Sequence, residues 1–432
     1  MTNGPGRRLN QRRNQDRRRA YRSLVPFWLD PLILFSFITI FSVLGSLLVS
    51  ESVYTEKWRV PKYVDASTLR YSIVVLLAFA AGYFILKPRM PSNSLPALPL
   101  VSRSWIAFTL TGAIVGHLLL FGHNFLQGSL SLTEITSLFA GDTGVANQIR
   151  GNSLHVPGLT TLTQLSLPAV CLWASSRESR SRYRVALVIL LLLVCARSVI
   201  FSERLALIEV MVGAAIVLIR SGIFEGAGAR RRALLRYLPL PAIVVLLMMF
   251  TAYESTRSWQ FYSETGQYDS ALEFGSYRLL AYYTTSVNNG ELMAEQLETP
   301  PYYTVEFLWN MPGSATLLGL DESRISREFR RVLTAKGTLE FNNIGGMRSP
   351  YIDYGSAVSL LGWGVAGAAC ARALRSWNRG SAASTVLFPI VVLTLMESPR
   401  FIYASLGRAL PALLIVSLLA LSSHRGSPSA MR

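Results

Sequence analysis

The stretch 195-CARSVIFSERLALIE-209 places charged side chains between two strongly apolar segments, with almost no loop to hold them. The segments at 183–200 and 203–220 each have the length and composition that a membrane helix needs. Arg197, Glu203 and Arg204 would therefore lie at a membrane boundary, where a charged group is unfavourable unless it is paired. The role of these charged residues depends on which side of a membrane this turn faces.

The composition supports a membrane protein. Of the 432 residues, 51% are hydrophobic and 16% are charged. A bilayer accommodates that much apolar surface, whereas a single soluble core does not. The net charge is +17, but the basic residues cluster at the ends of apolar runs and form no patch with aromatics, so no nucleic-acid partner is predicted. The three cysteines lie in or beside apolar runs and suggest neither disulfides nor a zinc site.

We therefore predict an all-α integral membrane protein with about ten transmembrane helices and a large extracytoplasmic loop. The spans are expected approximately at 31–50, 70–87, 104–124, 158–176, 183–200, 203–220, 237–254, 355–373, 383–398 and 401–421. The corresponding regions are a basic, disordered tail (1–24), transmembrane helices 1–7 (25–254), the extracytoplasmic loop with interfacial helices (255–354), transmembrane helices 8–10 (355–421) and a C-terminal tail (422–432).

The distribution of basic residues predicts the orientation. The 1–24 tail and the loops at 87–103, 176–184, 220–236 and 372–382 are rich in Arg and poor in acids, whereas 51–69 and 125–157 are nearly balanced. Because basic loops stay on the cytoplasmic side, both termini and the first set are predicted to be cytoplasmic. The 195–209 turn then faces outward.

The predicted outer loop, 255–354, is longer than a connection requires, and such loops usually carry function. Its segments 271–287 and 302–320 are apolar enough to lie along a membrane surface. Residues 322–333, behind the N-cap candidate Asp321, form an amphipathic helix in the prediction. Ile325, Phe329, Val332 and Leu333 share one face, and Arg324, Arg327 and Arg331 the other.

Arginines and carboxylates gather at the predicted outer ends of the helices. The arginines are Arg197, Arg204, Arg257, Arg348 and Arg400, with Arg408 deeper, and the acids are Glu203, Glu254, Asp353 and Glu397. Guanidinium groups at a dry boundary suit the phosphate oxygens of a lipid carrier. The alternative is a set of structural ion pairs, which is less favoured because the arginines outnumber the nearby acids.

Three motifs within residues 180–375 resemble those of the bacterial O-antigen or oligosaccharide repeat-unit polymerases, the Wzy-type family. They are an S-x-R-x-x-x-I turn (Ser202, Arg204, Ile208), the stretch 282-YYTTSVNNG-290 in a large outer loop, and 351-YIDYGSAVSLLGWG-364 running into a span. The ten spans are fewer than many relatives have. The catalytic histidine of the related O-antigen ligases has no clear counterpart here.

The resemblance implies a multi-span, GT-C-like glycosyltransferase at the outer face of a bacterial plasma membrane. It would polymerise oligosaccharide repeat units carried on polyprenyl (undecaprenyl) diphosphate into a surface polysaccharide. Its partners would be membrane lipids, the lipid-linked oligosaccharide, and chain-length regulator and flippase proteins. Two alternatives stay open: a ligase-type transferase on the same scaffold, and a transporter or flippase of lipid-linked glycans.

Such a transfer needs cations for the departing diphosphate and a base for the attacking hydroxyl. Arg197, Arg204 and Arg348 are the first candidates for the diphosphate, followed by Arg257, Arg278 and Arg400. Asp353 is the first candidate base, with Glu254 and His155 as alternatives, although Asp353 could instead cap a helix that begins near Gly355. No metal motif occurs, and no cofactor is predicted.

Overall fold

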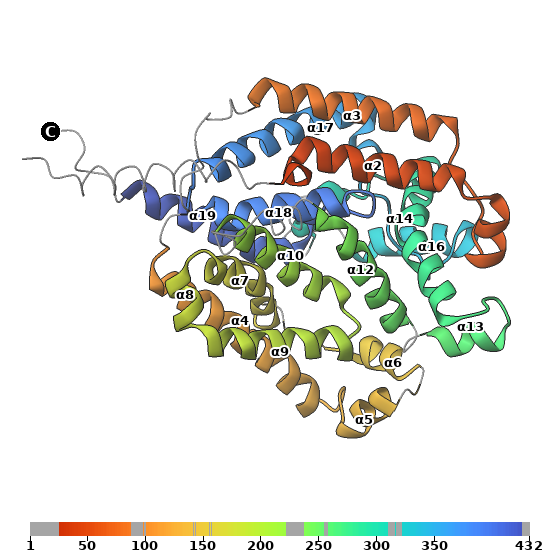
Figure 1. Ribbon diagram of the computed structural model, residues 1–432. Coiled ribbons are helices and arrows are strands. Elements are labelled where there is room, and N and C mark those ends of the chain that lie inside the picture. Colours follow the sequence, from red (N-terminus) through yellow and green to blue (C-terminus); the bar gives the residue numbers. More distant parts are fainter. Residues whose placement is uncertain are drawn as a thin grey trace, which may run out of the picture.

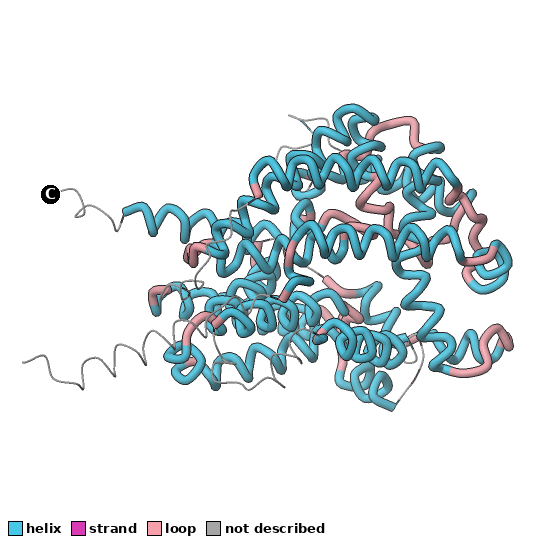
Figure 2. Tube along the Cα trace, turned by 45° about the horizontal axis from the view of Figure 1, so that its top comes forward, coloured by secondary structure: helices cyan, strands magenta, loops and turns pink. Residues whose placement is uncertain are grey.

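The computed structural model describes residues 26–87, 98, 101–140, 142, 144–154, 156, 158–221, 237–254, 258–309, 316 and 322–425. Every regular element within these ranges is a helix, which confirms the all-α prediction. Figure 2 shows these helices joined by short connections.

The elements follow one another in this order: η1 (Phe27–Leu29), α2 (Pro31–Leu48), η2 (Val53–Lys57), α3 (Ala66–Leu86), α4 (Arg103–Leu126), α5 (Leu132–Ala140), α6 (Val145–Asn152), η3 (Thr160–Leu165), α7 (Ser166–Ala174), α8 (Arg177–Arg182), α9 (Arg184–Ile200), α10 (Arg204–Arg220), α12 (Pro239–Glu254), α13 (Gln260–Glu264), α14 (Ala271–Gln296), η5 (Tyr303–Leu308), α16 (Glu322–Lys336), α17 (Ser349–Asn378), α18 (Ser384–Glu397), η6 (Tyr403–Ser405), η7 (Gly407–Ala409) and α19 (Leu410–Arg425).

Among the described residues, four helices are long and apolar enough to cross a membrane: α2, α3, α4 and α17. The apolar helices α12 and α18 and the segment Gly407–Ser422 are shorter than a typical span. The predicted span at 158–176 is divided between η3 and α7, while α9 and α10 have 17 residues each. Four helices are thus compatible with a membrane protein, and the other six spans stay predictions.

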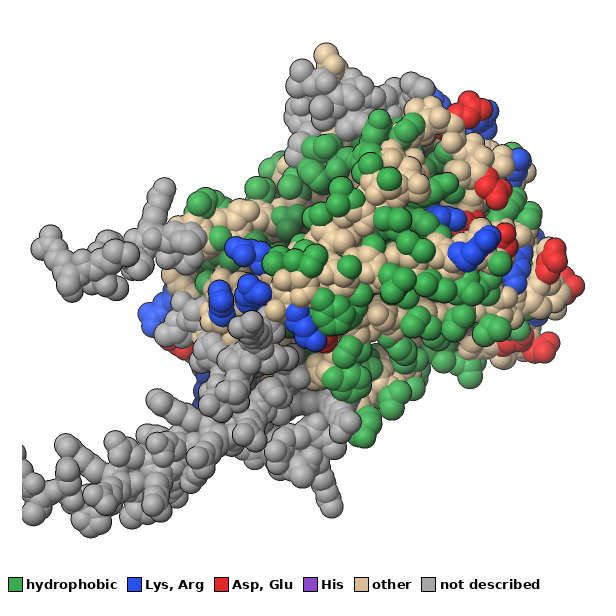
Figure 3. Space-filling view, turned by 90° about the horizontal axis from the view of Figure 1, so that it is seen from above, with side chains coloured by type: hydrophobic (Ala, Val, Ile, Leu, Met, Phe, Trp, Pro, Cys, Tyr) green, Lys and Arg blue, Asp and Glu red, His purple; other side chains and the backbone are tan. Residues whose placement is uncertain are grey.

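The long helices run lengthwise through the molecule, as Figure 1 shows. We call the two ends of this bundle the α8 end (left in Figure 1) and the α14 end (right). Charged side chains gather towards both ends of the face drawn in Figure 3, and the region between them is largely hydrophobic. This distribution is typical of a bilayer-facing surface.

Helices α3 and α17 pack closest together, through glycines. A Cβ on Gly82 would overlap the carbonyl oxygen of Gly364, and one on Gly367 would overlap that of Phe79. Small residues let two helix backbones approach to this distance, which is how helices gain packing where lipid surrounds them. α17, which begins at the α14 end, is thereby held beside α3 along its length.

The basic loops predicted to be cytoplasmic meet at the α8 end. Arg103 pairs with Glu178, and Arg180 donates to the hydroxyl of Ser221 at 2.9 Å. Arg375 donates to the carbonyl of Leu86 at 2.7 Å. The described parts of four separate Arg-rich loops therefore lie at one end of the bundle, away from the 195–209 turn.

Helix α14 packs against several other elements at the α14 end. The hydroxyl of Ser46 in α2 donates to the carbonyl of Thr284 at 3.3 Å, the amide of Asn288 donates to the carbonyl of Pro61 at 2.9 Å, and Gly290 packs against Arg348 before α17. Residues 284–293 are all buried. Part of the segment predicted to lie along a membrane surface is therefore enclosed by the protein. Its Thr and Ser hydroxyls donate to carbonyls one turn earlier in α14, so they can be buried there.

The amphipathic helix predicted at 322–333 is present as α16. Its apolar residues Val332 and Leu333 are buried beside Leu292 and Met293 of α14, whereas Arg327 and Arg331 are exposed. Asp321 and the side chain of Arg324 lie outside the described residues. The apolar face of α16 is therefore used to pack against α14.

Candidate functional site

The turn between α9 and α10 depends on the backbone of Ser202. Its φ of 54° lies in the left-handed region, which is unfavourable for a residue other than glycine by roughly 1–2 kcal/mol. This conformation reverses the chain so sharply that Glu203 returns to Arg197, with Oε2 2.5 Å from Nη2. The Arg197 side chain is 5% exposed, so the pair lies inside the α14 end.

Arg204, the first residue of α10, joins three helices. It forms an ion pair with Glu254 at the end of α12. Its guanidinium carbon lies 4.6 Å from the ring centre of Phe250 and 5.6 Å from that of Tyr282 in α14. Aromatic faces stabilise a buried cation where water is excluded.

Arg278, in α14, lies next to the Arg204–Glu254 pair. It pairs with Glu340, and its Nε lies 3.6 Å from Oε2 of Glu254, so Glu254 faces two arginines. Burial lowers the pKa of Arg278, but Glu340 and Glu254 outweigh burial and leave that pKa above its ordinary value. The hydroxyl of Tyr262 donates to Glu340 at 2.7 Å, and burial raises the pKa of Tyr262 to about 12.

Arg400 enters the same region from the turn after α18. It pairs with Glu397, and its guanidinium carbon lies 3.5 Å from the ring centre of Tyr282. Arg204 and Arg400 therefore contact the same aromatic ring. The backbone carbonyl of Arg400 accepts from the N–H of Gly345 at 3.1 Å, which ties this turn to the segment before α17.

Arg348 lies at the start of α17 and is bound by α14. Its Nε donates to Oε2 of Glu291 at 3.0 Å, and its guanidinium carbon lies 4.0 Å from the ring centre of Tyr71. Burial raises the pKa of Glu291, and the hydrogen bond from Arg348 opposes that rise.

Deeper in the bundle, Arg408 pairs with Glu209 of α10, Nε to Oε1 at 2.7 Å.

Each of these six arginines has a glutamate partner in the structure. The pairs are Arg197–Glu203, Arg204–Glu254, Arg278–Glu340, Arg348–Glu291, Arg400–Glu397 and Arg408–Glu209. Among the described residues, the prediction that the arginines outnumber the nearby acids is therefore wrong; Arg257, which it also counted, lies outside them. It counted acids close in sequence, whereas Glu291 and Glu340 come from distant parts of the outer-loop region.

The pairing does not use all of the guanidinium donors. Within the described part of the chain, Nε of Arg197, Nη1 of Arg204 and Nε of Arg400 are buried without a hydrogen-bond partner. An unpartnered buried donor is unfavourable because it leaves a desolvated polar group, and these guanidinium donors remain open to an acceptor. We call Arg197, Arg204, Arg278, Arg348, Arg400 and Arg408 the arginine cluster.

Asp353, the first candidate base, accepts hydrogen bonds from the start of η5. Its Oδ2 accepts from the N–H of Thr304 at 2.8 Å and from its hydroxyl at 2.7 Å, and Oδ1 accepts from the N–H of Tyr303 at 3.1 Å. The carboxylate thus caps η5. The backbone of Gly355 (φ 78°, ψ 178°) does break α17, so that a helical segment begins near Gly355 as expected, but the bonds of Asp353 go to η5 instead. Both oxygens are occupied by these donors.

The other candidates divide into two groups. Glu254 holds Arg204 and faces Arg278, so its oxygens are surrounded by cations. Arg257 and His155 lie outside the described residues. Sequence reasoning missed Glu291 and Glu340 as partners, although the polar run 288-NNGE-291 in an otherwise apolar region was a usable signal.

The described residues contain no group of three or more His, Cys, Asp or Glu side chains placed to hold a metal ion. Comparisons of the chain with protein-family models, with curated proteins and with solved structures find no match.

Proposed function

We propose that this chain is a glycosyltransferase of the multi-span, GT-C-like kind, with about ten transmembrane helices. It polymerises oligosaccharide repeat units carried on polyprenyl diphosphate, at the outer face of a bacterial plasma membrane, as the resemblance to the Wzy-type polymerases implies. The observation that carries the proposal is the arginine cluster, of which Arg197, Arg204, Arg278 and Arg400 are buried, with its unpartnered guanidinium donors.

The placement of charges supports the proposed orientation. The Arg-rich loops meet at the α8 end, and the arginine cluster lies at the α14 end. If basic loops mark the cytoplasm, the cluster lies at the outer boundary of the membrane. The diphosphate of a polyprenyl carrier lies at that depth, with its hydrocarbon tail in the bilayer.

Ion pairs fit this role because they hold the cations in place before the substrate arrives. Glu254 and Glu397 fix Arg204 and Arg400 against one Tyr282 ring. A diphosphate would accept from the donors that these carboxylates leave open. Fixed cations in a site with little water stabilise a leaving group as its negative charge grows.

The reaction needs no group beyond the two substrates and a base. A hydroxyl oxygen of one carrier-linked repeat unit forms a bond to the anomeric carbon of the second glycan. The bond from that carbon to the diphosphate oxygen breaks, and the oxygen keeps the electron pair. The hydroxyl proton passes to a base, for which Asp353, Glu254 and His155 remain the candidates.

The proposal is tested by replacing Arg204 in the cells that make the glycan. Arg204→Ala should abolish long polymers and leave single repeat units on the carrier, while Arg204→Lys, which keeps the charge without the planar fork, should retain part of the activity. Arg327→Ala, on the exposed face of α16, is the matched control. Gel analysis of extracted glycans gives the length distribution, and membrane immunoblots give protein levels.

Polymers of unchanged length from Arg204→Ala, at normal protein levels, would refute the proposal. Normal carrier-linked polymers that fail to reach their final acceptor would instead assign the chain to the ligase-type alternative.

A further inference from the structure

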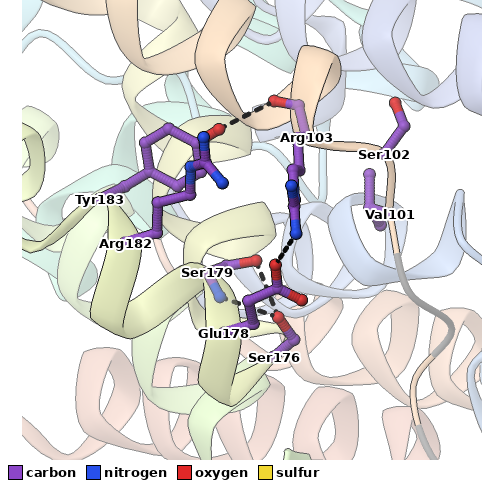
Figure 4. A pocket seen from close by; sticks show the side chains of 8 residues that line it. All are labelled: Val101, Ser102, Arg103, Ser176, Glu178, Ser179, Arg182 and Tyr183. Carbon is purple, nitrogen blue, oxygen red and sulfur yellow. Dashed lines mark hydrogen bonds and ion pairs between the residues drawn. The ribbon is translucent and has the colours of Figure 1, made fainter.

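A cavity of about 210 Å³ lies at the α8 end, between the start of α4 and the α8–α9 corner. Figure 4 shows its lining, with Arg103 reaching in from α4 and Arg182 from α8. The lining residues are Val101, Ser102, Arg103, Ser176, Glu178, Ser179, Arg182 and Tyr183. This cavity belongs to no part of the arginine cluster, which lies at the other end of the bundle.

The polar groups around the cavity are fixed by local hydrogen bonds. Arg103 forms an ion pair with Glu178, and the hydroxyl of Tyr183 donates to the carbonyl of Arg103 at 3.3 Å. The N–H of Ser179 donates to the hydroxyl oxygen of Ser176 at 3.1 Å. The walls from α4 and α8 are therefore held at a set separation.

The balance of charge in the lining favours an anion. Arg103 and Arg182 contribute two positive charges against the single negative charge of Glu178. Within the described ranges, Arg182 forms no ion pair with a carboxylate. Arginine forks together with serine hydroxyls are the donors that suit phosphate oxygens.

The position of the cavity indicates where that phosphate comes from. Arg103 is the first residue of α4, one of the four helices able to span a membrane. Half-buried Trp105 follows two residues later, and Tyr183 lines the cavity itself. Tyr and Trp at the end of a membrane helix lie at the depth of the lipid head groups.

We propose that this cavity binds a phosphate group at head-group depth, with Arg182 and Arg103 as its principal donors. The expected source is the phosphodiester of an anionic phospholipid, and free phosphate is the other source of the same chemistry. Binding would link the start of α4 to α8. The inference is independent of the proposed polymerase activity.

The test uses the purified full-length chain in nanodiscs of phosphatidylcholine, with thermal unfolding as the readout. Nanodiscs containing phosphatidylglycerol should raise the unfolding temperature by a few degrees, and Arg103→Gln/Arg182→Gln should lose most of that increase. Arg182→Gln alone keeps the Arg103–Glu178 pair and should lose at least half of it. Arg177→Gln/Arg184→Gln, two exposed arginines of α8 and α9 that do not line the cavity, is the matched control and should retain the increase.

A second arm adds inorganic phosphate to the phosphatidylcholine nanodiscs. If phosphatidylglycerol raises the unfolding temperature of the wild type and phosphate alone does not, the ligand is a lipid head group. If phosphate raises the unfolding temperature as much as phosphatidylglycerol does, and Arg182→Gln loses this increase, the cavity is still a phosphate site, but its ligand is a soluble anion. An increase that survives in Arg103→Gln/Arg182→Gln, or that the control variant loses equally, would overturn the proposal.

Discussion

At the scale of single residues, the arginine cluster depends on side chains that are far apart in the sequence. The 195–209 stretch predicts that Arg197 and Arg204 lie at a helix end, and in the structure both are buried at the α14 end. Their surroundings could not be predicted in the same way. Glu254 and Tyr282 reach Arg204 from α12 and α14, and only tertiary packing brings these helices together.

Ser202 offers a test of the turn that positions Arg204. Because its φ of 54° suits glycine, Ser202→Gly should leave the free energy of unfolding unchanged or raise it by up to about 1 kcal/mol. Ser202→Val should lower it by about 2 kcal/mol because a β-branched residue fits this conformation poorly. Ser104→Val, at an exposed helical position, is the control for thermal unfolding in detergent. Equal effects of the Gly and Val substitutions at position 202 would show that the turn is not strained.

Tyr262 predicts a stability change in alkaline solution. Burial raises the pKa of this phenol to about 12, so the folded state binds its proton more tightly than the unfolded chain does. Its contribution to stability is complete below about pH 10 and is lost as the pH rises towards 12. The free energy of unfolding should therefore fall by up to about 1.4 kcal/mol per pH unit in this range from this group.

Tyr262→Phe should remove that part of the alkaline loss, as measured by chemical unfolding at several pH values. The rest of the loss of stability at alkaline pH comes from other buried tyrosines such as Tyr268 and will remain in this variant. A variant whose pH profile matches the wild type would contradict the assignment.

At the scale of elements, periodicity and length predicted where helices occur better than how they pack. The segment 271–287 lies within the 26-residue helix α14, in the region where interfacial helices were predicted. No pattern in the sequence indicates that α14 packs against several other elements at one end of the bundle. Its buried Thr, Ser and Asn side chains are polar, and a sequence pattern assigns such residues to a solvated surface. Their backbone partners, among them Pro61 and Phe341, become visible only in the fold.

The α3–α17 contact predicts which glycines tolerate a side chain. Gly82→Ala places a methyl group against the carbonyl oxygen of Gly364, so the two helices must move apart. Overpacking of this kind typically lowers the free energy of unfolding by about 1–3 kcal/mol. Gly362→Ala, where no atom lies within 4 Å of the added carbon, should be neutral or slightly stabilising. Equal thermal stability of the two variants would argue against the close packing.

At the scale of the whole molecule, the charge distribution predicts an orientation that labelling can test. The composition predicted a membrane protein, and four of the described helices have the length and composition of spans. The count of ten spans stays a prediction because the other apolar helices are shorter. In a background with all three cysteines replaced by alanine, Thr334→Cys on α16 should react with a membrane-impermeant maleimide in intact cells. Ser181→Cys on α8 should react only after permeabilisation. Both positions are exposed. The reverse pattern would place the arginine cluster at the cytoplasmic side.

The most direct measurement separates the structural role of the Arg204–Glu254 pair from its proposed role in the transfer reaction, in which Arg204 binds diphosphate and Glu254 is a candidate base. Replacing a buried ion pair by apolar residues of similar volume is often neutral or stabilising. Arg204→Met/Glu254→Leu should therefore insert and unfold like the wild type, while the cells make no long glycan. Lys57→Met/Glu273→Gln, a more exposed pair at the same end, is the control and should leave polymer length unchanged. Polymer of normal length from the Arg204→Met/Glu254→Leu variant would show that Arg204 serves packing alone, and it would contradict the account.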